Sequence, residues 1–170
     1  MNSNNNQSKI DKEISEINEI IDNWEDTDSI YMEEHIRELR HRIMYVHTRL
    51  ESAVGVLIGV YVLAPAYDTF SEETSQLIMT RFDNVISETD FARKVNLAEE
   101  FNLIPGTLKD KLFKVNSLRL IFSHPKSHEA EIKSFLDEET YLKALKTLRD
   151  AYNEMNTLLG DLVKKIRKQG

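Results

Sequence analysis

The sequence predicts an all-α protein, folded as a single antiparallel bundle of five to six helices. Only three prolines and five glycines occur among the 170 residues, and long stretches are rich in Glu, Lys, Leu and Ala, which favour helices. Apolar residues also recur at the three-and-four spacing that gives a helix one buried stripe. We expect one domain over residues 9–170. The Asn- and Ser-rich residues 1–8 predict a disordered tail before it.

The first two predicted helices cover residues 9–23 and 30–63, each with one continuous apolar stripe. Within the second helix, Gly55 and Gly59 lie four residues apart on one face. Because neither residue carries a side chain, another helix is expected to approach closely there. Pro65 is expected to end this helix, since proline cannot supply a backbone donor.

Two shorter helices are predicted in the middle of the chain, over residues 71–87 and 90–102. In the first of them, Leu77 and Val85 belong to the stripe that should face the core. Asp90 precedes the second and is a favoured residue type for capping a helix start.

The last part of the chain predicts a helix over residues 108–123, with Thr107 as its cap. A short helix is expected around residues 132–135, and a long final helix over residues 139–168. No internal repeat or linker composition divides the chain.

Composition and charge exclude several function classes. The net charge of −7 argues against broad, non-specific affinity for nucleic acid, although a local basic site remains compatible with it. Without cysteine there is no disulfide, thiolate metal site or cysteine nucleophile. The longest uncharged run, residues 52–67, is shorter than a bilayer requires. We therefore expect a cytoplasmic protein that uses no membrane, metal or cofactor.

The strongest candidate for a chemical site is the segment Arg119-Leu120-Ile121-Phe122-Ser123-His124-Pro125. On a continuous helix, Arg119 and His124 would diverge by about 140°. Pro125 disfavours helical backbone at His124, so the imidazole is expected to turn toward the arginine. A guanidinium grips phosphate oxygens, and histidine side chains move protons near neutral pH, so together they suit a phosphodiester.

Spacing alone does not single out this pair. Arg42 and His47 have the same separation, in the middle of the long second helix. Only Arg119 and His124 flank a helix end and a proline, which is the context that favours them.

Residues 87–125 resemble the HEPN superfamily, most closely its mannitol-repressor-like branch. The resemblance rests on the segment Ser-Glu-Thr-Asp-Phe-Ala-Arg-Lys-Val-Asn-Leu-Ala-Glu-Glu-Phe-Asn-Leu-Ile-Pro and on Lys-Val-Asn-Ser-Leu-Arg-Leu-Ile-Phe-Ser-His-Pro. The upstream Leu50-Glu51 pair, before the apolar run, is also similar. The similarity covers about 80 residues and is strongest over about 40 of them.

The resemblance implies a helical domain that dimerises, with the Arg and His of both subunits near the twofold axis. Active members cleave RNA without a metal, through attack of the 2′-hydroxyl on the neighbouring phosphate. His124 would then transfer the proton and Arg119 would orient and stabilise the phosphate. Lys114 and Lys126, which flank the pair in the sequence, are the expected RNA-binding residues.

The chain departs from the family pattern at Leu120, where a polar residue, commonly Asn, follows the arginine. Many members of the superfamily lack nuclease activity, so two function hypotheses stay open. One is a metal-independent endoribonuclease or RNA-processing module of toxin or defence type, acting as a homodimer on an RNA substrate. The other is a non-catalytic HEPN-like regulatory or protein-binding module. An antitoxin or regulatory protein is the partner expected in either case.

Overall fold

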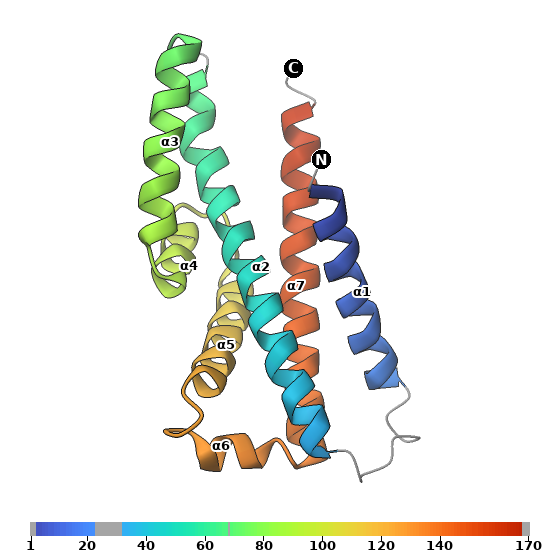
Figure 1. Cartoon of the computed structure of the whole chain (residues 1–170). Helices are drawn as coiled ribbons and strands as arrows, with labels where there is room; N and C mark the ends of the chain where they lie inside the picture. The colour runs from blue at the N-terminus through green and yellow to red at the C-terminus, as the bar shows by residue number, and fades with distance from the viewer. Residues whose placement is uncertain (1–2, 23–31, 68, 168–170) are drawn as a thin grey trace. The chain divides into compact units, whose positions relative to one another are not determined.

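The computed structural model describes the backbone of residues 3–22, 32–67 and 69–167, and every regular element in these ranges is a helix (Figure 1). The all-α prediction is therefore confirmed. The described ranges hold seven helices, one for each of the seven segments predicted to be helical, although five to six were expected for the bundle as a whole. In chain order they are α1 (Ser3–Asp22), α2 (Met32–Tyr67), α3 (Glu72–Glu88), α4 (Phe91–Glu100), α5 (Gly106–Ser123), α6 (Glu129–Ser134) and α7 (Glu138–Arg167).

The helices build two compact units. Unit 1 combines residues 1–48 with 114–153, and unit 2 combines residues 49–113 with 154–170. The long helices α2, α5 and α7 each contribute one part to each unit. Both units therefore depend on contacts between segments far apart in the sequence.

Unit 1 packs α1, the first part of α2, the end of α5, α6 and the start of α7. The Phe122 ring of α5 lies 5.2 Å from the ring of Phe135, which follows α6. Arg42 of α2 is only 7% exposed and pairs with Glu16 of α1, at 3.3 Å between Nη2 and Oε2. The completely buried apolar side chains of this unit are Ile17, Leu39, Ile43, Val46, Val115, Tyr141, Leu145, Leu148 and Ala151.

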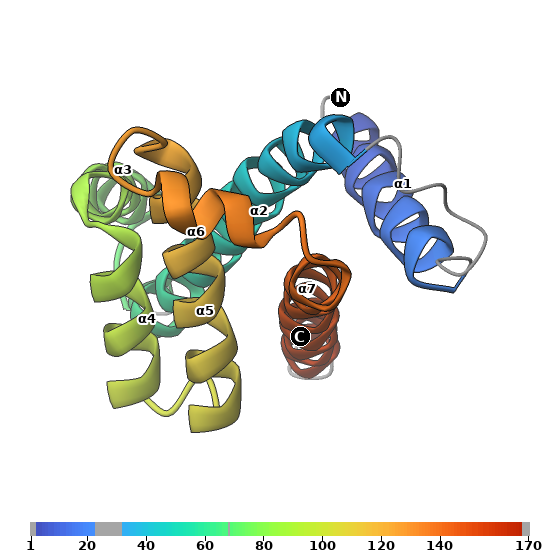
Figure 2. The same ribbon diagram turned by 90° about the horizontal axis from the view of Figure 1, so that it is seen from below.

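Unit 2 packs α3, α4 and the first part of α5 with the second part of α2 and the end of α7. α4 lies beside the first part of α5 in both ribbon views (Figures 1 and 2), and Lys109 of α5 pairs with Glu99 of α4. Lys94 of α4 is 5% exposed and its Nζ lies 2.8 Å from Glu51 Oε1 of α2. The unit therefore buries an ion pair beside its apolar core.

The prediction of a close helix approach at Gly55 and Gly59 is confirmed. A β carbon added to Gly55 would lie 3.3 Å from Cγ2 of Ile86, and one added to Gly59 would lie 3.5 Å from Cε1 of Phe82. Both partner residues belong to α3, so this helix lies against the glycine face of α2.

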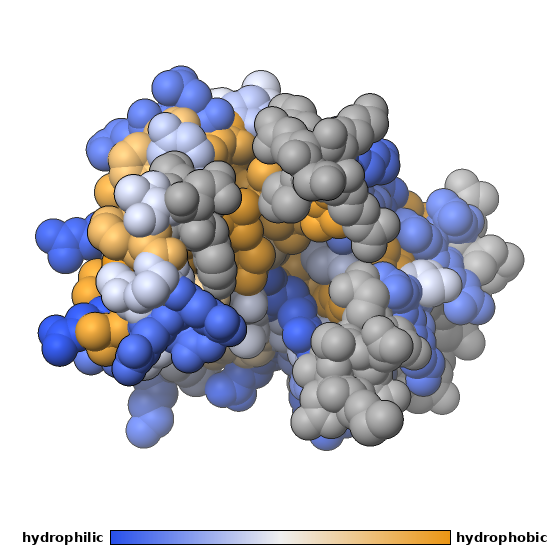
Figure 3. All heavy atoms as spheres, turned by 90° about the horizontal axis from the view of Figure 1, so that it is seen from above, coloured by the Kyte–Doolittle hydropathy of each residue, from blue (hydrophilic) through white to orange (hydrophobic). Residues whose placement is uncertain are grey.

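The predicted burial of α3 is wrong. Leu77 is 57% exposed and Val85 63% exposed, and the one buried residue of α3 is Ser75. In Figure 3, apolar atoms (orange) are visible among hydrophilic ones on the side where α2 and α3 lie. The apolar stripe exists, but α2 covers only part of it.

Local signals located some helix ends correctly and others not. Asp90 caps α4 as predicted, because its Oδ1 accepts a hydrogen bond from the Arg93 N–H at 2.9 Å. The Thr107 cap is wrong, since α5 begins one residue earlier and the Pro105 carbonyl accepts from Leu108 and Lys109 N–H. The predicted end at Pro65 is also wrong, because α2 continues to Tyr67. One missing donor near a helix end removes too little to stop the helix.

At the other end of the chain, α1 begins at Ser3, inside the segment for which composition predicts disorder, while residues 1–2 lie outside the described ranges.

The stretch Glu34–Leu63 of α2 is long and apolar enough to cross a membrane by length and composition. The core helix of a soluble protein meets the same criterion, and 39% of the most apolar window is buried here. Leu39, Ile43, Val46 and Leu50 are completely buried side chains within it. The cytoplasmic location stays a prediction.

Candidate functional site at the end of helix α5

Helix α5 ends at Ser123, one residue before His124, as the sequence predicted. The His124 N–H still donates to the Leu120 carbonyl at 3.2 Å, which continues the helical pattern by one bond. The His124 carbonyl then accepts from the Ser127 N–H at 3.0 Å, and the chain turns. The N–H of His124 is therefore the last donor of the helical pattern, and the turn begins at this residue, directly before Pro125.

Arg119 lies on the face of α5 that contacts α2. Three residues before it, Asn116 Oδ1 lies 3.2 Å from Nε2 of His47. Four residues after it, the Ser123 hydroxyl donates to the Met44 sulfur at 4.0 Å. Since Asn116, Arg119 and Ser123 are spaced by three and four residues, they share one face of the helix. Arg119 is accordingly half-buried.

His124 is exposed at the surface of unit 1, directly after α5. Within the described ranges, no hydrogen bond or ion pair joins the side chains of Arg119 and His124 to each other or to another residue. The structure thus places the two groups at the same end of α5 without a direct bond between them. Both have side-chain donors available for a ligand.

The second Arg–His pair with the same spacing is occupied by internal partners. Arg42 pairs with Glu16 and also lies 3.8 Å from Glu38, while His47 is 5% exposed and bonded to Asn116. These two side chains connect α2 to its neighbours inside unit 1. Of the two pairs, only Arg119 and His124 keep side chains without an internal partner among the described residues.

The predicted RNA-binding lysines lie at different places around α5. Lys126 is exposed in the turn two residues after His124. Lys114 precedes Arg119 by five residues, which puts it about 140° around the helix. It lines a separate cavity with Leu118 and Ile121. Lys126 is therefore the lysine nearest in the chain to the candidate site.

Leu120, the residue that departs from the family pattern, is 41% exposed. An apolar side chain thus stands at the surface between Arg119 and the end of the helix. Asn116 is the polar neighbour that sequence reasoning missed. Its position three residues before Arg119 was the available signal, because residues so spaced are neighbours on a helix.

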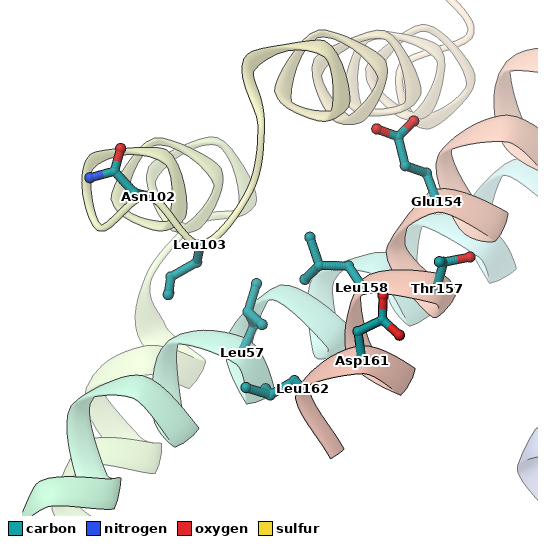
Figure 4. Close-up of a pocket in the computed structure, with 8 residues that line it drawn as sticks. All are labelled: Leu57, Asn102, Leu103, Glu154, Thr157, Leu158, Asp161 and Leu162. Atoms are coloured by element: carbon teal, nitrogen blue, oxygen red, sulfur yellow. The ribbon is translucent and has the colours of Figure 1, made fainter. Parts of the chain in front are cut away.

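A larger hollow, of about 530 Å³, lies in unit 2 and contains none of the predicted site residues. Figure 4 shows Leu57, Leu103, Leu158 and Leu162 turned toward the shared space, with Asn102 pointing away. Its two carboxylates are already paired, Glu154 with Lys111 and Asp161 with Lys164. Among the residues whose positions are described, no group of three His, Asp or Glu side chains is arranged to hold a metal ion.

A comparison of the chain with protein-family models finds no match, and comparisons with curated proteins and with solved structures find no significant match either.

Proposed function

We propose that this chain is a HEPN-like protein that acts on RNA, as a metal-independent endoribonuclease or RNA-processing module of toxin or defence type. The observation that carries the proposal is the contrast between its two Arg–His pairs. Arg42 and His47 are buried with internal partners, whereas Arg119 is half-buried and His124 exposed, and the side chains of these two form no hydrogen bond or ion pair with any described residue. A half-buried guanidinium without a carboxylate has a strong preference for an anion.

The chemistry assigned to this site needs only these two groups and the RNA itself. Arg119 binds the scissile phosphate through its planar fork of donors and stabilises the charge that develops there. His124 takes the proton from the attacking 2′-hydroxyl and then gives it to the leaving 5′-oxygen. The bond to the 5′-oxygen breaks as the 2′-oxygen bonds to phosphorus, which yields a 2′,3′-cyclic phosphate and a free 5′-hydroxyl.

The proposed active form is a homodimer in which Arg119 and His124 of both subunits meet. This arrangement is supported by the resemblance to the HEPN superfamily, which implies that the Arg and His of both subunits lie near the twofold axis. Light scattering should give twice the 19.8 kDa mass of the chain. A strict monomer under conditions of activity would exclude a composite site.

The decisive experiment incubates the protein with single-stranded and structured RNA in EDTA and identifies the product ends. Cyclic-phosphate ends are expected from the wild type, and strongly reduced cleavage from Arg119→Ala and from His124→Ala. Arg40→Ala is the matched control, because Arg40 is an exposed arginine on α2 away from α5. Cleavage that persists unchanged in both site variants would remove the pair from the mechanism.

RNA affinity gives a separate measure of the site. Lys126→Gln should weaken binding and lower the salt dependence by about one unit of slope, as for the loss of one phosphate contact. Lys114→Gln should have the smaller effect, because Lys114 lies on another face of α5. An equal loss in both variants would indicate a broader RNA surface than the one proposed.

The second candidate function, a non-catalytic HEPN-like regulatory or protein-binding module, is favoured by one observation. Leu120 exposes an apolar side chain beside Arg119, where a polar group would assist catalysis. Under this reading the protein neither cleaves RNA nor binds it at low salt. A partner protein, such as an antitoxin or regulator, would instead cover this end of α5.

A further inference from the structure

A cavity of about 340 Å³ in unit 1 has an apolar interior and a cationic edge. It lies between α5 and the start of α7, with Phe135 from the end of α6. Phe135 is 5% exposed and Ala144 4% exposed, so the floor consists of side chains fixed in the core. Leu118 and Ile121 form the half-buried wall on α5.

Two lysines line this cavity, Lys114 from α5 and Lys143 from α7. Both are exposed, and neither forms an ion pair or side-chain hydrogen bond with any residue that the structure places. Two other lysines of the same unit have carboxylate partners, in the pairs Lys12–Glu16 and Lys133–Glu129, whereas the exposed Lys126 and Lys146 form no ion pair with a described residue. In a chain of net charge −7, two unpaired ammonium groups beside one apolar hollow are complementary to an anion.

Ser117, Thr140 and Thr147 carry the hydroxyl groups of the lining, and both threonine hydroxyls already donate to acceptors of the protein. The Thr140 hydroxyl donates to Asp137 Oδ2 at 2.8 Å, and the Thr147 hydroxyl donates to the Lys143 carbonyl at 2.8 Å. Their protons are therefore already used within α7 and its cap. A bound anion would have to be held by the lysines, at the edge of the cavity.

We propose that this cavity binds a small amphipathic carboxylate, of the type of a medium-chain fatty acid. The carboxylate is held between Lys114 and Lys143, and the hydrocarbon chain enters the hollow between Leu118, Ile121 and Phe135. The volume lies at the lower end of the range for ligand sites, about 300 to 1,000 Å³, and so selects a small ligand. Lys114 is also one of the two proposed RNA-binding lysines, whereas Lys143 and the apolar lining of the cavity are not part of the RNA site.

Calorimetric titration with octanoate tests the proposal on the full-length protein. We expect saturable binding to one site per chain. The affinity should rise from hexanoate to octanoate by roughly fourfold for each methylene that enters the hollow. Octanol, which has the chain without the charge, should bind roughly tenfold more weakly.

Variants separate the contributions of charge and shape. The double change Lys114→Gln and Lys143→Gln should weaken octanoate binding roughly tenfold, a modest loss because both lysines are exposed. Lys146→Gln is the matched control, since Lys146 is an exposed lysine of α7 that does not line the cavity. Ser117→Phe should block the hollow, because Ser117 lines it from an exposed position. Circular dichroism verifies that each variant is folded.

Several results would overturn the proposal. One is a failure of octanoate to saturate a site, and another is binding of octanol or octylammonium as tight as that of octanoate. Binding that survives both Ser117→Phe and the double lysine change would place the carboxylate elsewhere. RNA cleavage is not a readout of this experiment, so its loss or survival does not affect the conclusion.

Discussion

His47 on α2 and Asn116 on α5 form a hydrogen bond inside unit 1, with 3.2 Å between Nε2 and Oδ1. A carbonyl oxygen can only accept, so the histidine Nε2–H donates. The bond lies one helical turn before Arg119 and fixes the face of α5 on which that arginine stands.

Removing one partner of this bond should cost more than replacing both. Asn116→Ala leaves a donor of His47, a side chain only 5% exposed, with less hydrogen bonding, and should lower the free energy of unfolding by about 1–3 kcal/mol. The double variant His47→Leu, Asn116→Leu should lose less than the sum of the single changes. Urea unfolding of the wild type, His47→Leu, Asn116→Leu and the double variant measures this coupling. Strict additivity would mean that the bond contributes nothing.

Gly→Ala substitutions at three helical glycines compare the effect of helix packing on stability, because the space around the new β carbon differs at each position. Alanine is favoured over glycine in a helix by about 1 kcal/mol, so Gly160→Ala, with nothing within 4 Å of the new β carbon, should stabilise the protein by about that amount. Gly59→Ala should gain nearly as much, because 3.5 Å is an ordinary contact. Gly55→Ala should gain least, since Ile86 at 3.3 Å must shift. Thermal unfolding ranks the three, and a largest gain at Gly55 would contradict the α2–α3 packing.

Two of these glycines, Gly55 and Gly59, also show what could be predicted from the sequence. Their spacing indicated a close helix approach, and the helix that approaches is α3. The Asp90 cap was equally predictable, because a cap depends on neighbours within one turn. The exposure of Leu77 and Val85 could not be predicted. An apolar stripe shows which face of a helix could be buried, but it does not show whether another element covers that face.

For the candidate site, too, only the features that depend on neighbouring residues could be predicted from the sequence. The end of α5 before His124 follows from local backbone restrictions at Pro125. The internal partners of Arg42 and His47 depend on α1 and α5, which are distant in sequence. No spacing rule could have shown that this pair is structural. The position of Lys94 in an apolar stripe with Phe91, Val95 and Ala98 was a readable signal of its buried charge.

Lys94 and Glu51 should respond asymmetrically to substitution. Glu51→Gln leaves an ammonium group that is 5% exposed without its carboxylate, and we expect a loss of about 2–3 kcal/mol, moderated because the Glu51 side chain is 33% exposed. Lys94→Met removes the buried charge and keeps the hydrocarbon volume, so it should cost less. Chemical denaturation of both variants is the measurement. A larger loss for Lys94→Met would show that the charge itself stabilises unit 2.

The buried phenol of Tyr141 should make the protein less stable at alkaline pH. Burial raises the pKa of its phenol from 10.0 to about 12, with Glu38 acting in the same direction and Arg42 against it. The unfolded chain therefore loses this proton at lower pH than the folded one. Stability is unaffected by this group below pH 10 and should fall by about 2–3 kcal/mol as the pH rises from 10 to 12. Denaturation at several pH values should show this loss in the wild type, and Tyr141→Phe should lack that portion of it. The same alkaline loss in both proteins would assign it to other groups.

The most direct test of the central claim, that Arg119 and His124 form one RNA site, is a kinetic double-mutant cycle on RNA cleavage under single-turnover conditions. Groups that act together on one transition state are strongly non-additive. We predict that Arg119→Ala, His124→Ala and the double variant each reduce the rate to nearly the same low level. If the two losses multiply in the double variant, or if either single variant cleaves at the wild-type rate, the residues do not share a site.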